Sequence, residues 1–243
     1  MSMRNKVKRL ESIYIGRNNQ NLEATRDRLI RGQSYRDLST IFVMPTRGVI
    51  PAKVVQSLLS LATPMNQKFL RIFVEKAEVS DAYNQAIEMI LANEELSKWR
   101  YVLTCEEDNC PPPDGLLRLY ESMNQFDAVS GLYWTKGEGT GQPMIYGDPK
   151  IMPKNYIPQL PIIDAVQECN GIGMGFALFK LDLFKKVPKP WFKTLQEYAP
   201  NQGMRAATQD LYFCGEAAKV GARFAVDNRI RVGHYDYQND VMY

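Results

Sequence analysis

The 243-residue sequence contains one histidine, His234, and four cysteines, and these low numbers exclude several kinds of active site. A single histidine rules out the HExxH zinc hydrolases. No GxSxG or GxxxxGK[ST] segment occurs, which argues against a serine-hydrolase elbow and against P-loop nucleotide hydrolysis. No CxxC pair is present, so we expect reduced, mostly buried thiols rather than a zinc site at Cys105, Cys110, Cys169 and Cys214.

Long apolar runs are also absent, and no stretch is long enough to span a bilayer. The first ten residues are basic and polar where a signal peptide would be apolar, so we expect a cytoplasmic protein. Thirty Lys and Arg against 27 Asp and Glu give a net charge of +3, too small to indicate a nucleic-acid or membrane partner for the whole chain. The composition, 45% hydrophobic and 23% charged, is that of a globular domain.

The N-terminal segment is more basic than the rest of the chain. Residues 1–37 hold nine Lys and Arg and four Asp and Glu, a local charge of +5. We expect residues 1–40 to form a basic extension that packs on the main domain. An alternative is an electrostatic arm for an anionic acceptor such as nucleic acid.

From residue 41 onward, apolar runs of strand length alternate with segments of helical periodicity. Three strand–helix pairs in succession predict a parallel sheet with right-handed crossovers. The expected strands are 41–44, 69–74 and 101–104, and the expected helices are 51–62, 80–91 with a cap at Ser80 or Asp81, and 114–123 with a cap at Asp114.

The second half has a different pattern, with glycines and prolines spread over 137–161 that exclude a long helix there. A helix is expected over 210–220. Further strands are expected over 128–134, 173–180, 224–226 and 229–232. We therefore expect one domain, 41–243, made of a nucleotide-type half (41–135) and a more irregular half (136–243).

Candidate ligand-binding residues follow the strands of the first half. In an open parallel sheet, ligands bind beyond the carboxyl ends of the strands. The segments 45–48 (PTRG) and 106–109 (EEDN) come there, as does Glu75. Two carboxylates two residues apart, Glu106 and Asp108, can bind one hard cation together with substrate phosphates, although an acidic turn in solvent would have the same sequence.

The order of these motifs, and of those downstream, resembles that of GT-A glycosyltransferases, most closely the large family-2-like group. The resemblance covers about residues 41–236 and depends on motif order more than on any single motif. It implies an α/β, Rossmann-like fold with a mostly parallel central sheet flanked by helices. The further segments that carry it are 81–86 (DAYNQA), 170–179 (NGIGMGFALF), 208–213 (TQDLYF, similar to an "ED" motif), 222–227 (ARFAVD) and 232–235 (VGHY).

This resemblance implies a metal-dependent transfer of a sugar from a nucleotide-diphosphate donor, a UDP-sugar by family frequency, to an acceptor hydroxyl. Asp108, with Glu106 and His234, would bind Mn²⁺ or Mg²⁺, which stabilises the departing diphosphate. Asp210 would take the proton of the acceptor hydroxyl, a role that predicts inversion at the anomeric carbon. The metal motif here begins with glutamate rather than aspartate, and the second strand ends in Glu75 without the usual acid pair.

The resemblance also assigns substrate contacts. The expected donor-side residues are Pro45, Thr46, Arg47, Glu75, Asp81, Asn84 and Glu107. The expected acceptor-side residues are Trp134, Gly173, Gly175 and Trp191. Each has a structural alternative: Asp210 as a helix cap, His234 as a structural histidine, the glycines as points of close backbone approach, and the tryptophans as core.

The acceptor itself is not specified by the sequence: a glycan, a protein, a lipid precursor and a modified nucleic-acid base all remain open. Compact enzymes of this kind also occur in phage-like genomes. Three other functions stay as alternatives. They are a sugar nucleotidyltransferase, for which the loop after the first strand is too short, a catalytically silent binding module that keeps the fold, and a nucleic-acid-binding protein.

Overall fold

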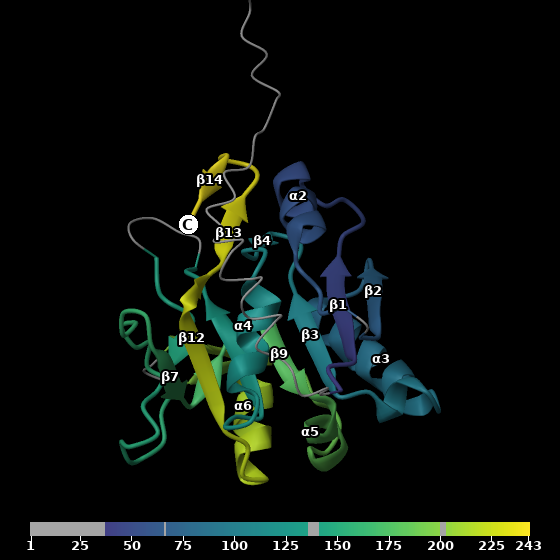
Figure 1. The fold of residues 1–243 in the computed structure, drawn as a ribbon. Helices are drawn as coiled ribbons and strands as arrows, with labels where there is room; N and C mark the ends of the chain where they lie inside the picture. The colour runs from purple at the N-terminus through teal and green to yellow at the C-terminus, as the bar shows by residue number, and fades with distance from the viewer. Residues whose placement is uncertain (1–36, 66, 136–140, 200–202) are drawn as a thin grey trace, which may run out of the picture.

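A computed structural model describes residues 37–65, 67–135, 141–199 and 203–243. Within these residues the centre of the protein is a seven-stranded sheet (Figure 1). Its order is β2 (Phe69–Glu75), β1 (Thr40–Thr46), β3 (Tyr101–Cys105), β9 (Phe176–Lys180), β5 (Ala128–Leu132), β12 (Phe224–Arg231) and β7 (Val166–Cys169). Strands β1, β2, β3, β5 and β12 run in one direction, and β9 and β7 run in the other.

Helices cover both faces of the sheet because alternate residues of the central strands point to opposite sides. In β1, Ile41 and Val43 join a core cluster with α3, α5 and α6, whereas Phe42 and Met44 join a second cluster with α4. Strands buried on both faces read as continuous apolar runs, which is why 41–44 is so conspicuous in the sequence. The helices are α2 (Ala52–Ser60), α3 (Val79–Ala92), α4 (Gly115–Ser122), α5 (Leu181–Lys186) and α6 (Gln209–Lys219), with a 3₁₀ turn η1 (Leu96–Lys98).

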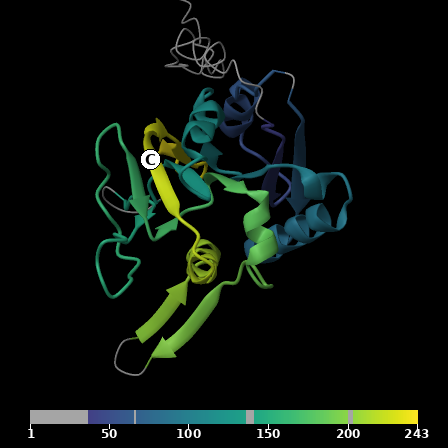
Figure 2. The ribbon, with the colours of Figure 1, turned by 60° about the horizontal axis from the view of Figure 1, so that its bottom comes forward.

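Short strands form three smaller sheets outside the central one. A C-terminal hairpin, β13 (Gly233–Asp236) and β14 (Val241–Met242), pairs with β4 (Asn109–Cys110) directly after β3. This pairing brings the end of the chain over the carboxyl edge of the sheet, at the top of Figure 1. The other two sheets are β6 (Ile145–Tyr146) with β8 (Gly171–Ile172), and β10 (Leu195–Ala199) with β11 (Gly203–Ala207), a hairpin that extends away from the sheet in Figure 2.

Several local expectations need correction. The expected cap of α3 at Ser80 or Asp81 is wrong: the N-cap is Glu78, whose carboxylate accepts from the backbone N–H groups of both residues. Residues 224–226 and 229–232 are not two strands. They belong to the single strand β12, with an irregularity in its pairing after Asp227. The β10–β11 hairpin was not expected.

No helix in the part of the chain that the structure describes is both long and apolar enough to cross a membrane. Residues 1–36 of the expected basic extension lie outside the described residues, and Thr40, its last residue, already belongs to β1.

Tight packing around Gly173 gives a test of the core. A Cβ at Gly173 would lie 2.1 Å from Tyr133 Oη and 2.8 Å from its ring, and Tyr133 is buried. We expect Gly173→Ala to lower the free energy of unfolding by about 1–3 kcal/mol, because the rigid phenol must move. The measurement is urea denaturation followed by circular dichroism.

Gly215→Ala is the matched control for this variant. Gly215 lies inside α6, and a Cβ there would meet only Tyr156 Oη, at 3.4 Å. Alanine should therefore raise the free energy of unfolding, by about 0.5–1 kcal/mol, through its higher helix propensity. Equal effects of the two substitutions would contradict the packing described around Tyr133.

Candidate functional site

Glu107 joins the ends of β1 and β3 at the carboxyl edge of the sheet. Its carboxylate is buried and accepts hydrogen bonds from Thr46 Oγ1 and the Arg47 backbone N–H, both at 2.8 Å. The Arg47 side chain donates to the same carboxylate through Nε. These three hydrogen bonds fix the loop after β1, and through them Glu107 positions Arg47.

Asp108 lies opposite the only histidine of the chain. The pairing of β4 with β13 places His234 across from Asn109, and Asp108 O accepts from the Tyr235 backbone N–H at 2.7 Å. His234 Nε2 is 3.5 Å from the Asp108 carboxylate. Both side chains are mostly buried, with 14% and 19% of their surface exposed.

The hydrogen bond made by Nδ1 of His234 determines whether Nε2 directs a hydrogen or a lone pair toward Asp108. Nδ1 is 2.6 Å from the carbonyl oxygen of Trp134, and a carbonyl only accepts, so Nδ1 carries the hydrogen. In the neutral imidazole, Nε2 then directs a lone pair toward the Asp108 carboxylate. A cation between the two groups makes their approach favourable: a proton on Nε2 would make them an ion pair, and a metal ion would bind both. Two ligand atoms about 2.1 Å from one ion lie about 3–4 Å apart. The pair therefore fits a divalent metal ion.

The C-terminal hairpin supplies the far wall of the site. Lys53 of α2 forms an ion pair with Asp240, and its Nζ lies 4.4 Å from the centre of the Tyr235 ring. The Tyr235 hydroxyl donates to the same Asp240 carboxylate at 2.8 Å. Asp240 has a positive φ of 54°, a conformation that aspartate tolerates in turns. These contacts hold the hairpin against the start of α2.

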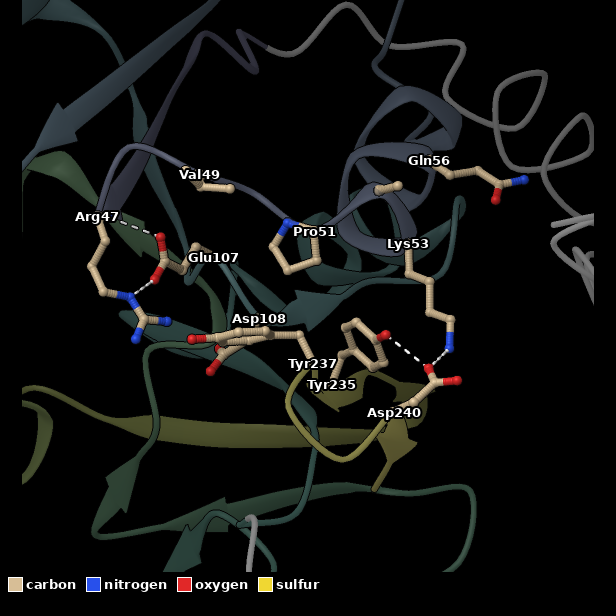
Figure 3. A pocket seen from close by; sticks show the side chains of 11 residues that line it. Arg47, Val49, Pro51, Lys53, Gln56, Glu107, Asp108, Tyr235, Tyr237 and Asp240 are labelled. Atoms are coloured by element: carbon tan, nitrogen blue, oxygen red, sulfur yellow. Dashed lines mark hydrogen bonds and ion pairs between the residues drawn. The ribbon is translucent and has the colours of Figure 1, made fainter. Parts of the chain in front are cut away.

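Between these walls lies a pocket of about 720 Å³. Two cationic side chains face it from opposite sides: Lys53, and Arg47, whose terminal nitrogens extend toward the side of Asp108 (Figure 3). Three carboxylates also line the pocket: Glu107 pairs with Arg47, Asp240 pairs with Lys53, and Asp108 faces His234. Cationic side chains beside a carboxylate suit an anionic ligand that also binds a metal ion. Its lining residues are Arg47, Val49, Pro51, Ala52, Lys53, Gln56, Glu107, Asp108, Tyr235, Tyr237 and Asp240.

Glu106 does not join Asp108 and His234 in a larger ligand set. No group of three or more His, Cys, Asp or Glu side chains that could hold a metal ion occurs among the described residues. Burial raises the pKa of Tyr133 well above its ordinary value, and the charges of Glu106 and Asp210 raise it further. A metal ion at Asp108 would therefore have two protein ligands and take the others from substrate and water.

Asp210, the expected base, is buried in the first turn of α6. Burial raises the pKa of its carboxyl, while hydrogen bonds from Thr208 Oγ1 and from the Leu211 backbone N–H oppose that shift. Asp210 does not line the 720 Å³ pocket. It shares the surroundings of Tyr133, whose ring lies edge-on to His234 at 5.7 Å between centroids.

The expected donor-side residues lie in different places. Pro45 and Thr46 end β1 and are buried, while Glu75 ends β2 and is exposed, as is Asp81 in the first turn of α3. Asn84 does not reach the pocket. Its amide donates to Phe192 O and accepts from the backbone N–H groups of Trp191 and Phe192, so Asn84 fixes that segment.

The expected acceptor-side residues also divide. Trp191 is 2% exposed and packs in the core, with its indole N–H bonded to Phe184 O, which does not fit a sugar contact. Gly173 and Gly175 are buried against Tyr133 and pack there without room for a Cβ. Trp134 is partly exposed and lines a second pocket, of about 500 Å³.

Sequence reasoning missed Lys53, Gln56, Tyr237 and Asp240. One signal could have found part of this set: the turn residues 238–240 (QND) between two short aromatic segments are typical of a hairpin. Nothing in the sequence shows that this hairpin returns to β4, because the pattern of a short strand does not identify its partner.

Comparisons with known proteins bear on the fold alone. No protein-family profile and no curated protein matches the sequence. Among solved structures, A197 from STIV superposes with a TM-score of 0.58 over 84% of this chain and 92% of its own, at 17% identity. A putative UDP-N-acetylglucosamine pyrophosphorylase from Entamoeba histolytica gives 0.40 at 8% identity, over 86% and 78% of the two chains, too low to carry an argument.

The predicted fold class is confirmed. The protein has a mixed α/β, Rossmann-like fold with a mostly parallel central sheet flanked by helices, and A197 from STIV is similar to it in fold.

The buried carboxyl of Asp210 gives a test of the electrostatics. Its pKa is raised in the folded protein, so stability falls as pH rises from the unfolded value of about 3.9 through the folded value. Asp210→Asn removes this loss and keeps an oxygen for the Leu211 N–H. We expect the variant to melt at a higher temperature than the wild type at neutral pH, with a difference that shrinks toward about pH 4.

Asp240→Asn is the control of opposite sign. Lys53 lowers the pKa of Asp240, so that carboxylate stabilises the fold above its unfolded pKa and loses this effect as pH falls through the folded value. This variant should melt below the wild type at neutral pH, and the difference should again shrink in acid. A lower melting temperature for Asp210→Asn at neutral pH would contradict the assigned cause of its pKa shift.

Proposed function

We propose that this protein is a metal-dependent glycosyltransferase that moves a sugar from a nucleoside-diphosphate donor to an acceptor hydroxyl. The observation that carries the proposal is the meeting of His234 Nε2 and the Asp108 carboxylate, 3.5 Å apart, at the carboxyl edge of the sheet. Asp108 also lines the pocket that contains Arg47 and Lys53. A diphosphate is the common ligand that needs both a divalent ion and cationic side chains.

Asp108 and His234 would hold Mn²⁺ or Mg²⁺, and that ion would supply Lewis-acid stabilisation of the diphosphate leaving group. Arg47 is held by Glu107 through Nε, which leaves its two terminal nitrogens directed toward the pocket. They would bind phosphate oxygens in the manner typical of a guanidinium. Lys53, on the opposite side, would bind the same group as a point charge.

The nucleoside would lie beside the loop after β1, toward the end of β2. Gly48, with a φ of 101°, brings this loop near Glu75: a Cβ on Gly48 would be 4.0 Å from the Glu75 carboxylate. Glu75 is exposed there and can accept from ribose hydroxyls. Asp81, exposed at the start of α3, is a further candidate contact. Uridine remains the base expected from the frequency of UDP-sugars in the family that the sequence resembles.

Asp210 would act as the base that takes the proton of the attacking hydroxyl, which gives inversion at the anomeric carbon. Its surroundings suit this role because burial raises the pKa of the carboxyl and so strengthens the carboxylate as a base. The charge of Asp210 raises the pKa of Tyr133, and the Tyr133 ring contacts the ring of His234.

The donor site is tested by thermal shift with nucleoside diphosphates and sugar nucleotides, in Mn²⁺ and in EDTA. A ligand at about 100 times its Kd stabilises a protein by about 2.7 kcal/mol, a shift of several degrees for a chain of this length. We expect a Mn²⁺-dependent shift with one nucleotide that is lost in Asp108→Asn. Asp182→Asn, an exposed substitution in α5, should keep it.

Two outcomes of this panel contradict the proposal. Absence of a shift with every nucleotide, with or without metal, removes the glycosyltransferase function and leaves a binding module that keeps the fold. A shift of equal size in EDTA and in Asp108→Asn removes the metal ion from the donor site.

The base is tested separately by turnover. Once a donor is known, Asp210→Asn should lower its hydrolysis or transfer by about 10²–10⁴-fold, because the proton acceptor is lost. The nucleotide-dependent thermal shift should stay, since Asp210 does not line the donor pocket. Near wild-type turnover in Asp210→Asn would show that another group takes the proton.

A further inference from the structure

The segment between β6 and β7 presents a group of large apolar side chains to solvent. Six of them, all within thirteen residues, are more than half exposed, whereas the sheet and helices bury most of their apolar residues. We refer to these six as the 151–163 surface: Ile151, Met152, Ile157, Leu160, Ile162 and Ile163.

These side chains are held in place by an ordered backbone. The Gly147 N–H donates to Ile157 O at 2.8 Å, and the Asn170 side chain donates to Asn155 O at 2.9 Å. Further along, Asn228 Nδ2 donates to Ile162 O at 2.8 Å. Hydrogen bonds therefore fix the backbone of the loop that carries these exposed apolar side chains.

The surface protrudes. Met152, Leu160 and Ile163 are exposed by 81%, 81% and 82%. In Figures 1 and 2 the loops of this segment project on the side of the edge strand β7, away from the α2 end of the sheet. Other highly exposed apolar residues, such as Leu59 and Met65, lie outside this segment, and no other thirteen consecutive described residues hold six that are more than half exposed.

Basic side chains lie next to the apolar tip. Lys150 and Lys154 are exposed and bracket Ile151 and Met152 directly in the sequence. Long lysine side chains keep the ammonium group in water while their stems lie against apolar material, so they are suited to a boundary between water and hydrocarbon. The acids of the segment are Asp148, whose carboxylate accepts from the Lys150 backbone N–H, and the exposed Asp164 beside Ile163. The positive charge therefore lies at the Met152 end of the surface.

We propose that the 151–163 surface docks on an anionic lipid bilayer. Projecting apolar side chains can enter the interface of a deformable bilayer, whereas a protein partner would need a matching hollow for each tip. The positive charges of Lys150 and Lys154 complement the negative charge of anionic lipid headgroups. The association is peripheral: the apolar tips enter the interface and the chain stays on one side.

This placement bears on the acceptor, in a step that rests on the proposed function. Pro161 and Ile163 also line the 500 Å³ pocket, together with Trp134 and the exposed Arg231. A docked bilayer would therefore border a pocket with a guanidinium group, next to the tryptophan whose carbonyl orients His234. The acceptor would then be a molecule carried by the membrane with its hydroxyl-bearing head in water.

The test is sedimentation of the full chain with phosphatidylcholine vesicles, with and without phosphatidylglycerol, in the absence of any nucleotide. We expect binding to the anionic vesicles that weakens with salt. The double variant Met152→Ser, Leu160→Ser should bind at least about tenfold more weakly, because apolar burial supplies much of the affinity. Lys150→Glu with Lys154→Glu should weaken binding to anionic vesicles by about tenfold or more.

The control is Leu59→Ser with Met65→Ser, which removes equally exposed apolar side chains outside the surface and should leave binding unchanged. Residues 1–37 carry a charge of +5 and can attract anionic vesicles by themselves. If the serine and the glutamate double variants of the 151–163 surface both bind vesicles as strongly as the wild type, the binding belongs to residues 1–37. That result would overturn the proposal.

Two further outcomes also overturn the proposal. Equal binding to neutral and anionic vesicles contradicts the anionic preference. The third result is that the protein does not bind vesicles and forms a dimer in light scattering, and that the Met152→Ser, Leu160→Ser variant is a monomer. This result would assign the surface to a second copy of the chain. Because no nucleotide is present, each result is independent of whether the protein transfers a sugar.

Discussion

The antiparallel pairing of β13 with β4 is the contact on which the candidate site depends. It places His234 opposite Asn109, beside Asp108, and the hydrogen bond from Nδ1 to Trp134 O then decides which nitrogen faces the carboxylate. The same pairing brings Tyr235, Tyr237 and Asp240 over the start of α2. Without it the chain would have an acidic turn after β3 and a histidine elsewhere, with no pocket between them.

Glu107 fixes the other side of the pocket, as the β13–β4 pairing fixes the first. One buried carboxylate accepts from Thr46 and from both the backbone and the side chain of Arg47, so the loop after β1 is fixed to the turn after β3. The hydrogen bond to Glu107, together with its negative charge, raises the pKa of Arg47 above its ordinary value, and the guanidinium stays charged. The consecutive acids Glu107 and Asp108 thus have different tasks: the first positions a cation, and the second faces the imidazole.

Much of the sheet could be predicted because buried strands leave a strong pattern. The runs 41–44 and 101–104 are apolar on both faces, and the helices between them show regular periodicity. Strand direction is not encoded in this way. β9 enters between β3 and β5 in the opposite direction, and its sequence would look the same in a parallel strand. The Glu78 cap was missed because Ser80 and Asp81 are the more usual cap residues.

For the site, the resemblance led to Asp108, His234 and Asp210, but it could not show how their neighbours are used. Asn84 and Trp191 have polar or aromatic side chains suited to a ligand, yet the structure engages Asn84 with backbone groups and Trp191 with the core. Lys53 and Asp240 were missed for the opposite reason: neither belongs to a motif, and their ion pair forms only when the C-terminal hairpin reaches α2.

The central claim is that Asp108 and His234 hold one divalent ion that also binds a diphosphate. The most direct test is a crystal structure with Mn²⁺ and the nucleoside diphosphate that gives the largest thermal shift, with anomalous scattering used to locate the metal. The claim predicts a peak between His234 Nε2 and the Asp108 carboxylate, with phosphate oxygens of the nucleotide completing its ligands. A bound nucleotide with no peak there, or a peak at other residues, would contradict it.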